Sequence, residues 1–405
     1  MAYITGQTLQ GCCLPVKYLG NDTYLCEPNT GDFYRRHRIY NDYHLWYVKV
    51  MGNKGERVTI RLKWPEYDPD RVSEEYKSWA SYSTDWPSFF PAVKDSLYIS
   101  SDEITWERIT GARNEDCYIV FSVVLPSDVC YISSTLRYTV ASHEKLKNDL
   151  AASSYAKVIT LDRGYDGIPV VTFAVTDFSV PAEQKKTVYL QGVQHCHENP
   201  GGHVLDYMLR FLVSDEAREM RQRYIFRITP VTDGAGWRLG QQLHPARQGS
   251  IDFNFNRDWG VFDIPEVRTL AAYLDEVKQS GEELCLLADL HGGSGDERED
   301  SSGASVSCDS RVAADTLRRN LAFCHMVQTQ CDYLDPKACN YWANEKSEGL
   351  FTSYAQRTWG PAFTFEVSMS KIWDRAAGKR LPNSQAAYRR LAEQLLRVID
   401  EFLRG

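Results

Sequence analysis

Short apolar runs alternate with amphipathic helical patterns over the second part of the chain, and no other feature restricts its possible folds as strongly. Residues 284–290 are almost continuously apolar, as expected of a strand buried on both faces of a sheet. The alternation predicts strands at 187–194, 224–228, 284–290 and 362–367, and helices at 143–152, 204–213, 265–279 and 312–328. Asn383 is expected to cap a last helix. Residues 292–310 are polar, and we expect a flexible loop there. The pattern predicts an α/β domain with a mixed β-sheet flanked by helices on both faces.

The first third of the chain is rich in β-branched and aromatic residues, and its patterns are those of short strands. Residues 57–62, Arg-Val-Thr-Ile-Arg-Leu, alternate strictly between polar and apolar side chains. Strands are expected at 44–50, 57–62, 97–100, 118–125 and 129–139. So many short strands predict an all-β sandwich. A length of 405 residues fits two domains. We therefore expect a β-sandwich at residues 1–142, and the α/β domain at residues 143–405.

Charge and cysteine content limit the partners and the compartment. A net charge of −8 argues against nucleic acid or an anionic membrane as the main partner. The longest mostly apolar stretch, residues 117–125, is far shorter than the roughly 18 residues that a membrane helix needs. The 11 cysteines are odd in number and irregularly spaced, as expected of reduced thiols. The N-terminus lacks the pattern of a secretory signal. We therefore expect a cytoplasmic protein with neither nucleic acid nor membrane as a partner. The sequence does not indicate whether the chain forms oligomers.

A His-x-x-Glu motif lies where a predicted strand gives way to a predicted helix. His195 and Glu198 stand at this corner, so both side chains can point at one place. Catalytic zinc is held by three such nitrogen and oxygen ligands and also binds water. His291, at the end of the 284–290 strand, is the natural third ligand, and Asp289 can orient its imidazole. His197 and His203 are the alternatives to His195.

Glu366 is the one carboxylate in the otherwise apolar strand-like run Phe363-Thr364-Phe365-Glu366-Val367. A buried carboxylate is costly unless it is paired or functional. Burial also raises its pKa toward the range that acid–base catalysis uses. Because strand residues alternate between faces, the competing interpretation places Glu366 on a solvated face.

Asn256 and Arg257 form a pair suited to binding a carboxylate. The guanidinium is a planar fork that matches a carboxylate, and the neighbouring amide adds a donor. Together they can hold the terminal carboxylate of a substrate. The alternative is a surface arginine that pairs with Asp258.

In this order the motifs resemble those of the zinc carboxypeptidases. The matching segments are Gln194-His195-Cys196-His197-Glu198, Pro230-Val231-Thr232-Asp233-Gly234 with Arg238, Phe255-Asn256-Arg257-Asp258-Trp259, Asp289-Leu290-His291 and Thr364-Phe365-Glu366. The resemblance covers roughly residues 145 to 400. The β module and the segment Thr135-Leu136-Arg137-Tyr138-Thr139 also look like the cytosolic subgroup, which carries a β-sandwich before the peptidase and tends to remove acidic residues.

The resemblance assigns roles to individual residues. It implies one zinc ion held by His195, Glu198 and His291, with Glu366 as general acid and base acting on a zinc-bound water. It also implies that Asn256 and Arg257 bind the substrate carboxylate and that Arg238 polarises the scissile carbonyl. Arg247 is the alternative to Arg238, and the substrate-binding tyrosine is expected to be Tyr354, or else Tyr341. Arg357 or Lys346 is a candidate for recognising an acidic C-terminal side chain.

The leading hypothesis is therefore a zinc-dependent carboxypeptidase that hydrolyses the C-terminal peptide bond of a peptide or protein tail. The alternative is a zinc amidohydrolase that deacylates N-acyl amino acids, since such enzymes also need a carboxylate clamp. A third possibility is a binding module that has kept the fold and lost catalysis. The presence of all three ligands and of Glu366 argues against that loss.

Overall fold

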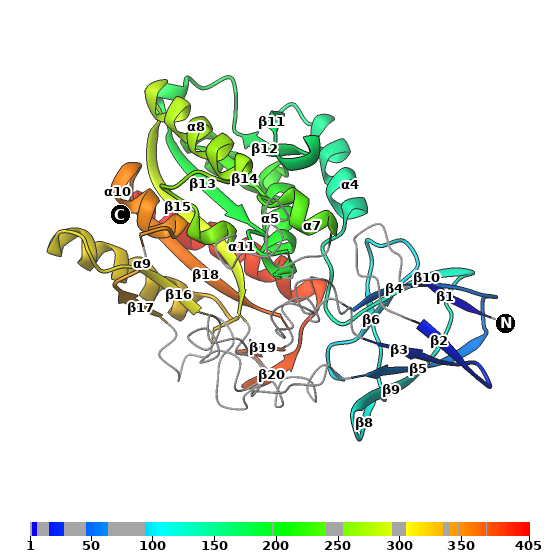
Figure 1. Ribbon diagram of the computed structural model, residues 1–405. Coiled ribbons are helices and arrows are strands. Elements are labelled where there is room, and N and C mark those ends of the chain that lie inside the picture. The colour runs from blue at the N-terminus through cyan, green and yellow to red at the C-terminus, as the bar shows by residue number, and fades with distance from the viewer. Residues whose placement is uncertain are drawn as a thin grey trace.

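The computed structural model describes residues 2–5, 16–27, 46–63, 94–196, 198–239, 254–293, 305–334, 341–346, 348–369 and 371–405. Two parts are visible in Figure 1: a β-sandwich at the N-terminal end, and a larger body in which a twisted sheet lies among helices. The fold class expected from the sequence is confirmed in both parts.

The N-terminal part consists of two sheets that pack face to face. One has the strand order β1 (Tyr3–Thr5), β4 (Tyr47–Met51), β10 (Val129–Ser133), β6 (Tyr98–Ser100) and β7 (Glu107–Arg108). The other has the order β2 (Val16–Gly20), β3 (Thr23–Cys26), β5 (Arg57–Lys63), β9 (Tyr118–Val124) and β8 (Arg113–Glu115). The alternation in β5 sends Val58, Ile60 and Leu62 into the core between the sheets, because successive strand residues point to opposite faces.

The larger part is built on one mixed sheet of eight described strands. Their order is β11 (Ala156–Arg163), β12 (Pro169–Val175), β14 (Tyr224–Thr229), β13 (Lys186–Gly192), β15 (Glu283–Gly293), β18 (Ala362–Ser368), β16 (Ser305–Asp309) and β17 (Tyr341–Asn344). β14, β13, β15 and β18 run parallel at the centre, and β16 pairs antiparallel with β18. The carboxyl ends of β13 and β15 therefore meet at one edge, where sites form in sheets of this kind.

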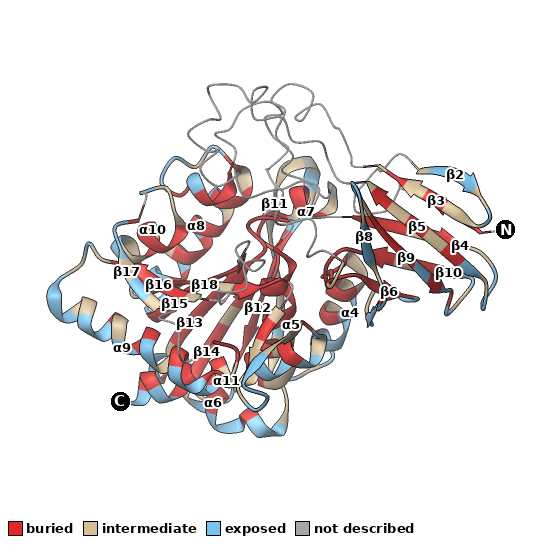
Figure 2. Ribbon diagram, turned by 90° about the horizontal axis from the view of Figure 1, so that it is seen from below, coloured by how far each residue is buried: buried red, intermediate tan, exposed pale blue. Residues whose placement is uncertain are grey.

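Helices cover both faces of this sheet, as Figure 2 shows by the buried strands between helices with exposed outer faces. α5 (Asn199–Leu212), α9 (Ala314–Gln330) and α11 (Gln385–Arg404) share one core with the sheet. α8 (Pro265–Gln279) and α10 (Phe351–Thr358) share another core on the opposite face. The shorter helices are α4 (Val140–Ala151), α6 (Arg218–Arg223) and α7 (Gly234–Leu239), and a hairpin of β19 (Lys371–Asp374) and β20 (Lys379–Pro382) precedes α11.

Several predicted boundaries were wrong, each for a local reason. α5 begins at Asn199 rather than at residue 204, because Pro200 fits the first turn of a helix. Ser384, not Asn383, caps α11 by accepting a hydrogen bond from the Ala387 N–H. Asn383 instead donates from its amide to the Ser368 carbonyl at 2.7 Å.

Strand lengths also differ from the prediction. β10 ends at Ser133, well before residue 139. The expected loop at 292–310 contains β16, whose serines hid the strand pattern. β11 and β12 were not predicted. The division between residues 142 and 143 stays a prediction, and α4 begins just before it, at Val140.

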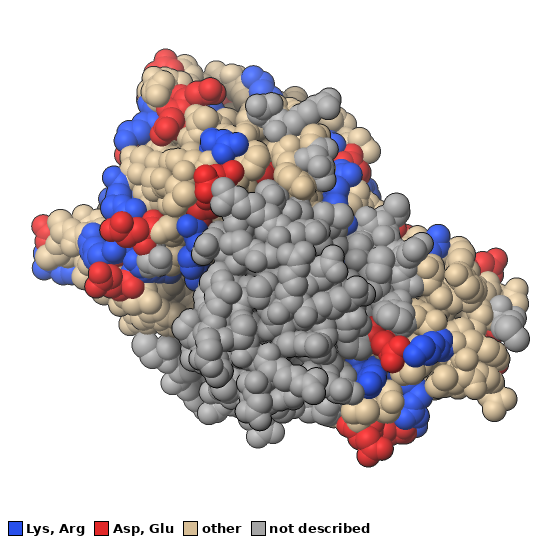
Figure 3. All heavy atoms as spheres, in the orientation of Figure 1, with Lys and Arg blue, Asp and Glu red and all other residues tan. Residues whose placement is uncertain are grey.

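The described surface agrees with the ordinary composition of the chain. On the face drawn in Figure 3, the coloured Lys and Arg side chains are interspersed with Asp and Glu side chains rather than gathered in one patch. Among the residues that the structure describes, no helix combines the length and the apolar character needed to span a bilayer.

Candidate active site

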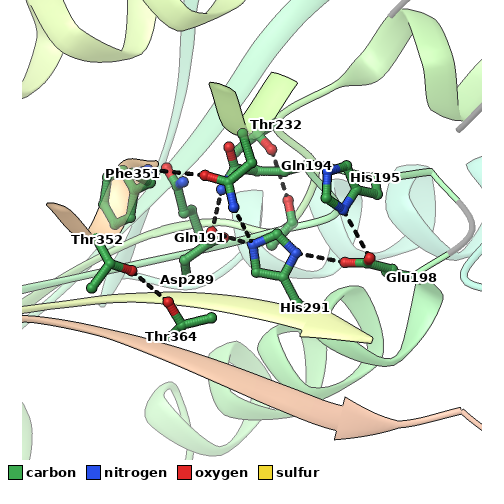
Figure 4. Close-up of polar contacts among 12 residues, drawn as sticks. Gln191, Gln194, His195, Glu198, Thr232, Asp289, His291, Phe351, Thr352 and Thr364 are labelled. Atoms are coloured by element: carbon green, nitrogen blue, oxygen red, sulfur yellow. Dashed lines mark hydrogen bonds and ion pairs between the residues drawn. The ribbon is translucent and has the colours of Figure 1, made fainter. Parts of the chain in front are cut away.

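His195, Glu198 and His291 converge at the carboxyl edge of the central sheet (Figure 4). His195 follows β13, Glu198 immediately precedes α5, and His291 lies near the end of β15. One ligand atom from each residue lies within 4.8 Å of the others. His195 Nδ1 is 2.8 Å from Glu198 Oε1, and His291 Nδ1 is 2.6 Å from Glu198 Oε2. The structure therefore brings together the three metal ligands expected from the sequence.

The outer nitrogen of each imidazole is held by a second side chain. His195 Nε2 lies 2.8 Å from Asn254 Oδ1, and His291 Nε2 lies 2.5 Å from Asp289 Oδ2. Both oxygens are acceptors, so they favour a proton on Nε2 and direct Nδ1 toward Glu198. Metal-binding histidines in proteins are oriented in this way by carboxylate or carbonyl partners.

The charges of the site favour a bound cation. Burial raises the pKa of Glu198, but the neighbouring charges of His195 and His291 outweigh it and hold that pKa well below its usual range. Burial lowers the pKa of His291, whereas Asp289 and Glu198 raise it well above the ordinary histidine value. The two carboxylates thus attract positive charge to the place where the Nδ1 atoms meet. Two imidazoles and one carboxylate are also a ligand set that zinc uses in catalytic sites.

Glu366 stands beside this cluster on the neighbouring strand. In the parallel pairing of β15 with β18, Glu366 lies opposite His291. Its side chain is partly buried, so Glu366 does not lie on the fully solvated face that the competing interpretation required. Burial raises the pKa of Glu366, and the charge of Glu198 raises it further, while the charge of His291 opposes the shift. A carboxylate with a raised pKa next to a metal site is suited to accepting and returning a proton.

Lys346 is buried in the same region and contacts hydroxyl groups. Its Nζ donates to Ser307 Oγ and to Thr364 Oγ1, both at 2.9 Å. Thr364 Oγ1 is also 2.6 Å from Thr352 Oγ1. Burial lowers the pKa of Lys346, and the charges of Glu366 and Asp289 act in the opposite direction. The charge of Lys346 therefore acts together with the carboxylates of Glu366 and Asp289, whereas Arg357 is exposed on α10.

Asn256 lies inside the cluster, and Arg257 lies at its margin. Asn256 Nδ2 is 3.0 Å from His291 Nε2, and its Oδ1 accepts from the Phe351 N–H at 2.9 Å. Arg257 is exposed, and its Nη1 donates to the Asn256 carbonyl at 2.8 Å. Asp258 directs its carboxylate to the backbone N–H groups of Asp263 and Ile264, at 3.0 and 2.8 Å.

The remaining sequence candidates are placed less directly. Arg238 lies on α7, where its charge helps to lower the pKa of His143, which burial depresses first. Arg247 and His197 fall outside the described residues. Tyr354 packs on α10 against the rings of Trp259, Phe262 and Trp359, and so lies in an aromatic cluster. Tyr341 lies on the outermost strand of the sheet, β17, and contacts the ring of His325.

Two residues that hold the site were missed in the sequence. Asn254 lies two residues before Asn256, and this spacing could have indicated that both amides reach the same site. Gln194 donates to Asp289 and accepts from Trp259 Nε1, the latter at 2.9 Å. His203, the alternative to His195, is instead stacked on Tyr388 within the core.

The cluster is also distinctive within the described part of the chain. In that part, His195, Glu198 and His291 are the one group of three or more potential ligands close enough to hold a metal ion. Asp289 Oδ1, which lies behind His291, is buried without a hydrogen-bond partner among the described residues.

Comparison with known proteins gives consistent matches. No protein-family model matches the sequence. The cytosolic carboxypeptidase 6 of Caenorhabditis elegans is 22% identical over 286 residues, which are 59% of this chain and 60% of that protein. The chain thus aligns with less than two thirds of the length of this relative.

Solved structures match over the whole chain. A metallo-carboxypeptidase from Burkholderia cenocepacia has a TM-score of 0.72 and 18% identity, covering 100% of this chain and 99% of the other. One from Pseudomonas aeruginosa, in complex with (2-guanidinoethylmercapto)succinic acid, has a TM-score of 0.74 and 14% identity, covering 99% of both chains. The chain therefore has the metallo-carboxypeptidase fold.

Proposed function

We propose that the protein is a zinc-dependent carboxypeptidase that removes the C-terminal residue of a peptide or protein tail. The observation that carries the proposal is the position of Glu366, directly across from the ligand His291 on adjacent parallel strands. A base within reach of a metal site is the arrangement that amide hydrolysis needs. The names of the sequence relative and of the full-length structural matches support the same activity.

We propose that His195, Glu198 and His291 hold one zinc ion through His195 Nδ1, His291 Nδ1 and the Glu198 carboxylate. Zinc, when bound there, would supply a Lewis acid that polarises the substrate carbonyl and acidifies water. Asn254 and Asp289 would keep the two imidazoles oriented through their Nε2 atoms.

Glu366 would carry the proton during hydrolysis. Its carboxylate takes a proton from the attacking water and returns it to the amine nitrogen of the leaving residue. The raised pKa of Glu366 suits both steps, because the group must accept a proton and then release it near neutral pH. Partial exposure of the side chain leaves it accessible to substrate.

Specificity for a free C-terminus would come from Arg257 and Asn256. The exposed guanidinium of Arg257 can form two parallel hydrogen bonds with a carboxylate. The Asn256 amide nitrogen lies next to His291 Nε2. When His291 Nε2 donates its own proton to Asp289, it cannot accept from Asn256, so the Asn256 N–H groups are available to a substrate carboxylate. We keep Arg238 and Tyr354 as proposals for polarising the carbonyl and for binding substrate, with Arg247 as the alternative to Arg238.

The peptidase is favoured over the deacylase because the solved structures that match the whole chain are named carboxypeptidases. The name of the nematode relative also supports a cytoplasmic location.

The test compares metal content and C-terminal residue release in one preparation. Peptides with a free C-terminus, the same peptides with an amidated C-terminus, and N-acyl amino acids are incubated with the wild type and with Glu366→Gln. We expect about one zinc ion per chain, release only from free C-termini, and no release by the variant. Absence of zinc, or release that the substitution leaves unchanged, would overturn the proposal. Preferential cleavage of N-acyl amino acids would support the deacylase instead.

A further inference from the structure

The segment that leaves the β-sandwich runs directly behind the metal-binding corner. Residues 134–139 connect β10 to α4, and Tyr138 within them is fully buried. Its neighbours lie on α5 and α7, far along the sequence. Tyr138 therefore belongs to the packing of the larger part, although it directly follows the sandwich.

The backbone of Tyr138 is bonded on both sides. Its N–H donates to Asn199 Oδ1 at 3.1 Å, and Asn199 is the first residue of α5, immediately after the ligand Glu198. Its carbonyl accepts from Trp237 Nε1 on α7 at 2.9 Å. The residue is thus bonded both to α5, the helix that follows Glu198, and to α7.

The segment leading into α7 also contacts the strand before His195. Thr232 N–H donates to the Gly192 carbonyl at 3.1 Å, and Asp233 N–H donates to the Val193 carbonyl at 3.2 Å. Val193 has a φ of +52°, which is costly for a β-branched residue. The surrounding bonds must therefore hold this turn in place two residues before His195.

The ring of Tyr138 fills the space that Gly202 leaves on α5. A Cβ atom at Gly202 would lie 2.6 Å from Tyr138 Cδ1, which is too close for a carbon contact. One turn further along the same face, the Tyr138 hydroxyl donates to Asp206 Oδ2 at 3.2 Å. The ring thus packs against the first turn of α5, next to Glu198, whereas the hydroxyl reaches only the following turn.

We propose that Tyr138 is a positioning residue for the metal site. By packing against Gly202 and bonding Asn199, it holds the start of α5 so that Glu198 faces His195 and His291. The segment that connects the β-sandwich to α4 thereby contributes to the geometry of a site to which it supplies no ligand. This inference rests on the proposed zinc site and does not depend on the peptidase reaction.

The test measures zinc affinity separately from folding. Tyr138→Leu removes the ring from the contact with Gly202, and Tyr138→Phe removes only the hydroxyl. Tyr98→Leu is the matched control, because Tyr98 is also a fully buried tyrosine of the sandwich side, and it bonds the Asn383 carbonyl at 3.1 Å, away from α5. Zinc dissociation constants are obtained by competition with a chromogenic chelator, and urea unfolding of the metal-free proteins gives stability.

We expect Tyr138→Leu to weaken zinc binding by roughly 10- to 100-fold, the usual effect of losing support behind a metal ligand. Tyr138→Phe should stay close to wild type, and Tyr98→Leu should lose stability with its zinc affinity unchanged. The visible spectrum of the cobalt-substituted protein should change in Tyr138→Leu and not in Tyr98→Leu, since it reports ligand geometry. Equal zinc affinities and spectra for Tyr138→Leu and wild type would overturn the inference.

A second variant keeps the test decisive if Tyr138→Leu does not fold. Gly202→Ala pushes a methyl group toward the ring, although alanine favours a helix over glycine by roughly 1 kcal/mol. We expect Gly202→Ala to weaken zinc binding, and any loss of stability to come from the contact with the ring rather than from helix propensity. The double variant Gly202→Ala with Tyr138→Leu should recover part of the zinc affinity. Unchanged affinity in Gly202→Ala would overturn the inference. A wild type that binds no zinc would overturn the proposed function and the inference together, whereas zinc binding without peptidase activity would leave the inference standing.

Discussion

His291 and Glu366 lie opposite each other on the parallel strands β15 and β18. Neighbouring strands are about 4.8 Å apart, so the ladder of hydrogen bonds sets the separation of the two backbones. His291 Nδ1 in turn lies 2.6 Å from the Glu198 carboxylate. The proposed base and the proposed ligand His291 are thus held by adjacent strands of the central sheet, and this relationship gives the first prediction.

Replacing Glu366 by Gln should abolish hydrolysis and preserve zinc binding. The amide keeps the size of the side chain and cannot accept the proton, and losing a general base costs roughly 10²- to 10⁴-fold in kcat. Measurement of kcat and of zinc content on the same samples checks this. Glu283→Gln, an exposed carboxylate at the other end of β15, is the control. A variant that loses zinc as well as activity would show that Glu366 supports the metal site rather than the proton transfer.

Replacing Asp289 by Asn should weaken zinc binding by roughly 10- to 100-fold, because the charge that orients His291 through Nε2 is lost. Asp275→Asn is the control, since Asp275 on α8 accepts a hydrogen bond from Trp359 Nε1, just after α10. Competition with a chelator gives the affinities. If both variants bind zinc as tightly as wild type, Asp289 does not support the metal ligand.

The stability of the metal-free protein should fall between pH 6.5 and about 4. Burial lowers the pKa of His143 and of His203 from 6.5 to about 4. Between these values the unfolded chain binds more protons than the folded chain, so stability decreases as the pH falls. Each histidine contributes roughly 3 kcal/mol to this loss, at 1.36 kcal/mol per pKa unit.

Urea unfolding in the presence of a chelator, at pH 7 and at pH 4.5, measures this loss. His143→Asn should reduce the difference between the two pH values. His325→Asn, an exposed histidine on α9, should leave the difference unchanged. An identical difference in wild type and His143→Asn would contradict the assignment to His143.

Replacing Lys346 by Met should move the acid limb of kcat/KM to higher pH. Burial raises the pKa of Glu366 and the charge of Lys346 opposes that shift, so removing the charge raises the pKa further. Glu366 must be ionised to accept a proton, and activity should therefore appear only at higher pH. Lys379→Met, at an exposed position, is the control. If instead KM rises only for acidic C-terminal residues and the pH profile stays unmoved, Lys346 recognises substrate, as the sequence allowed.

The sequence predicted the chemistry of the site because that chemistry depends on residue type and local spacing. His195 and Glu198 share one strand-to-helix corner, and His291 ends an apolar strand. Parallel strands bring such ends to the same edge, which is why two distant segments could be assigned to one site from the sequence alone. The alternation in residues 57–62 likewise determined which side chains of β5 are buried.

Other features were decided by tertiary packing. The register that sets Glu366 opposite His291 depends on how β15 and β18 align, and a shift by one residue would turn Glu366 to the other face. Asn254 and Gln194 support the ligands through contacts between segments that local patterns do not connect. The sequence by itself thus determined which side chains have the chemistry needed to bind a metal and to move a proton. Only the tertiary structure decided which of them face one another, because long-range packing and register are set by the whole core, as Tyr138 behind the start of α5 illustrates.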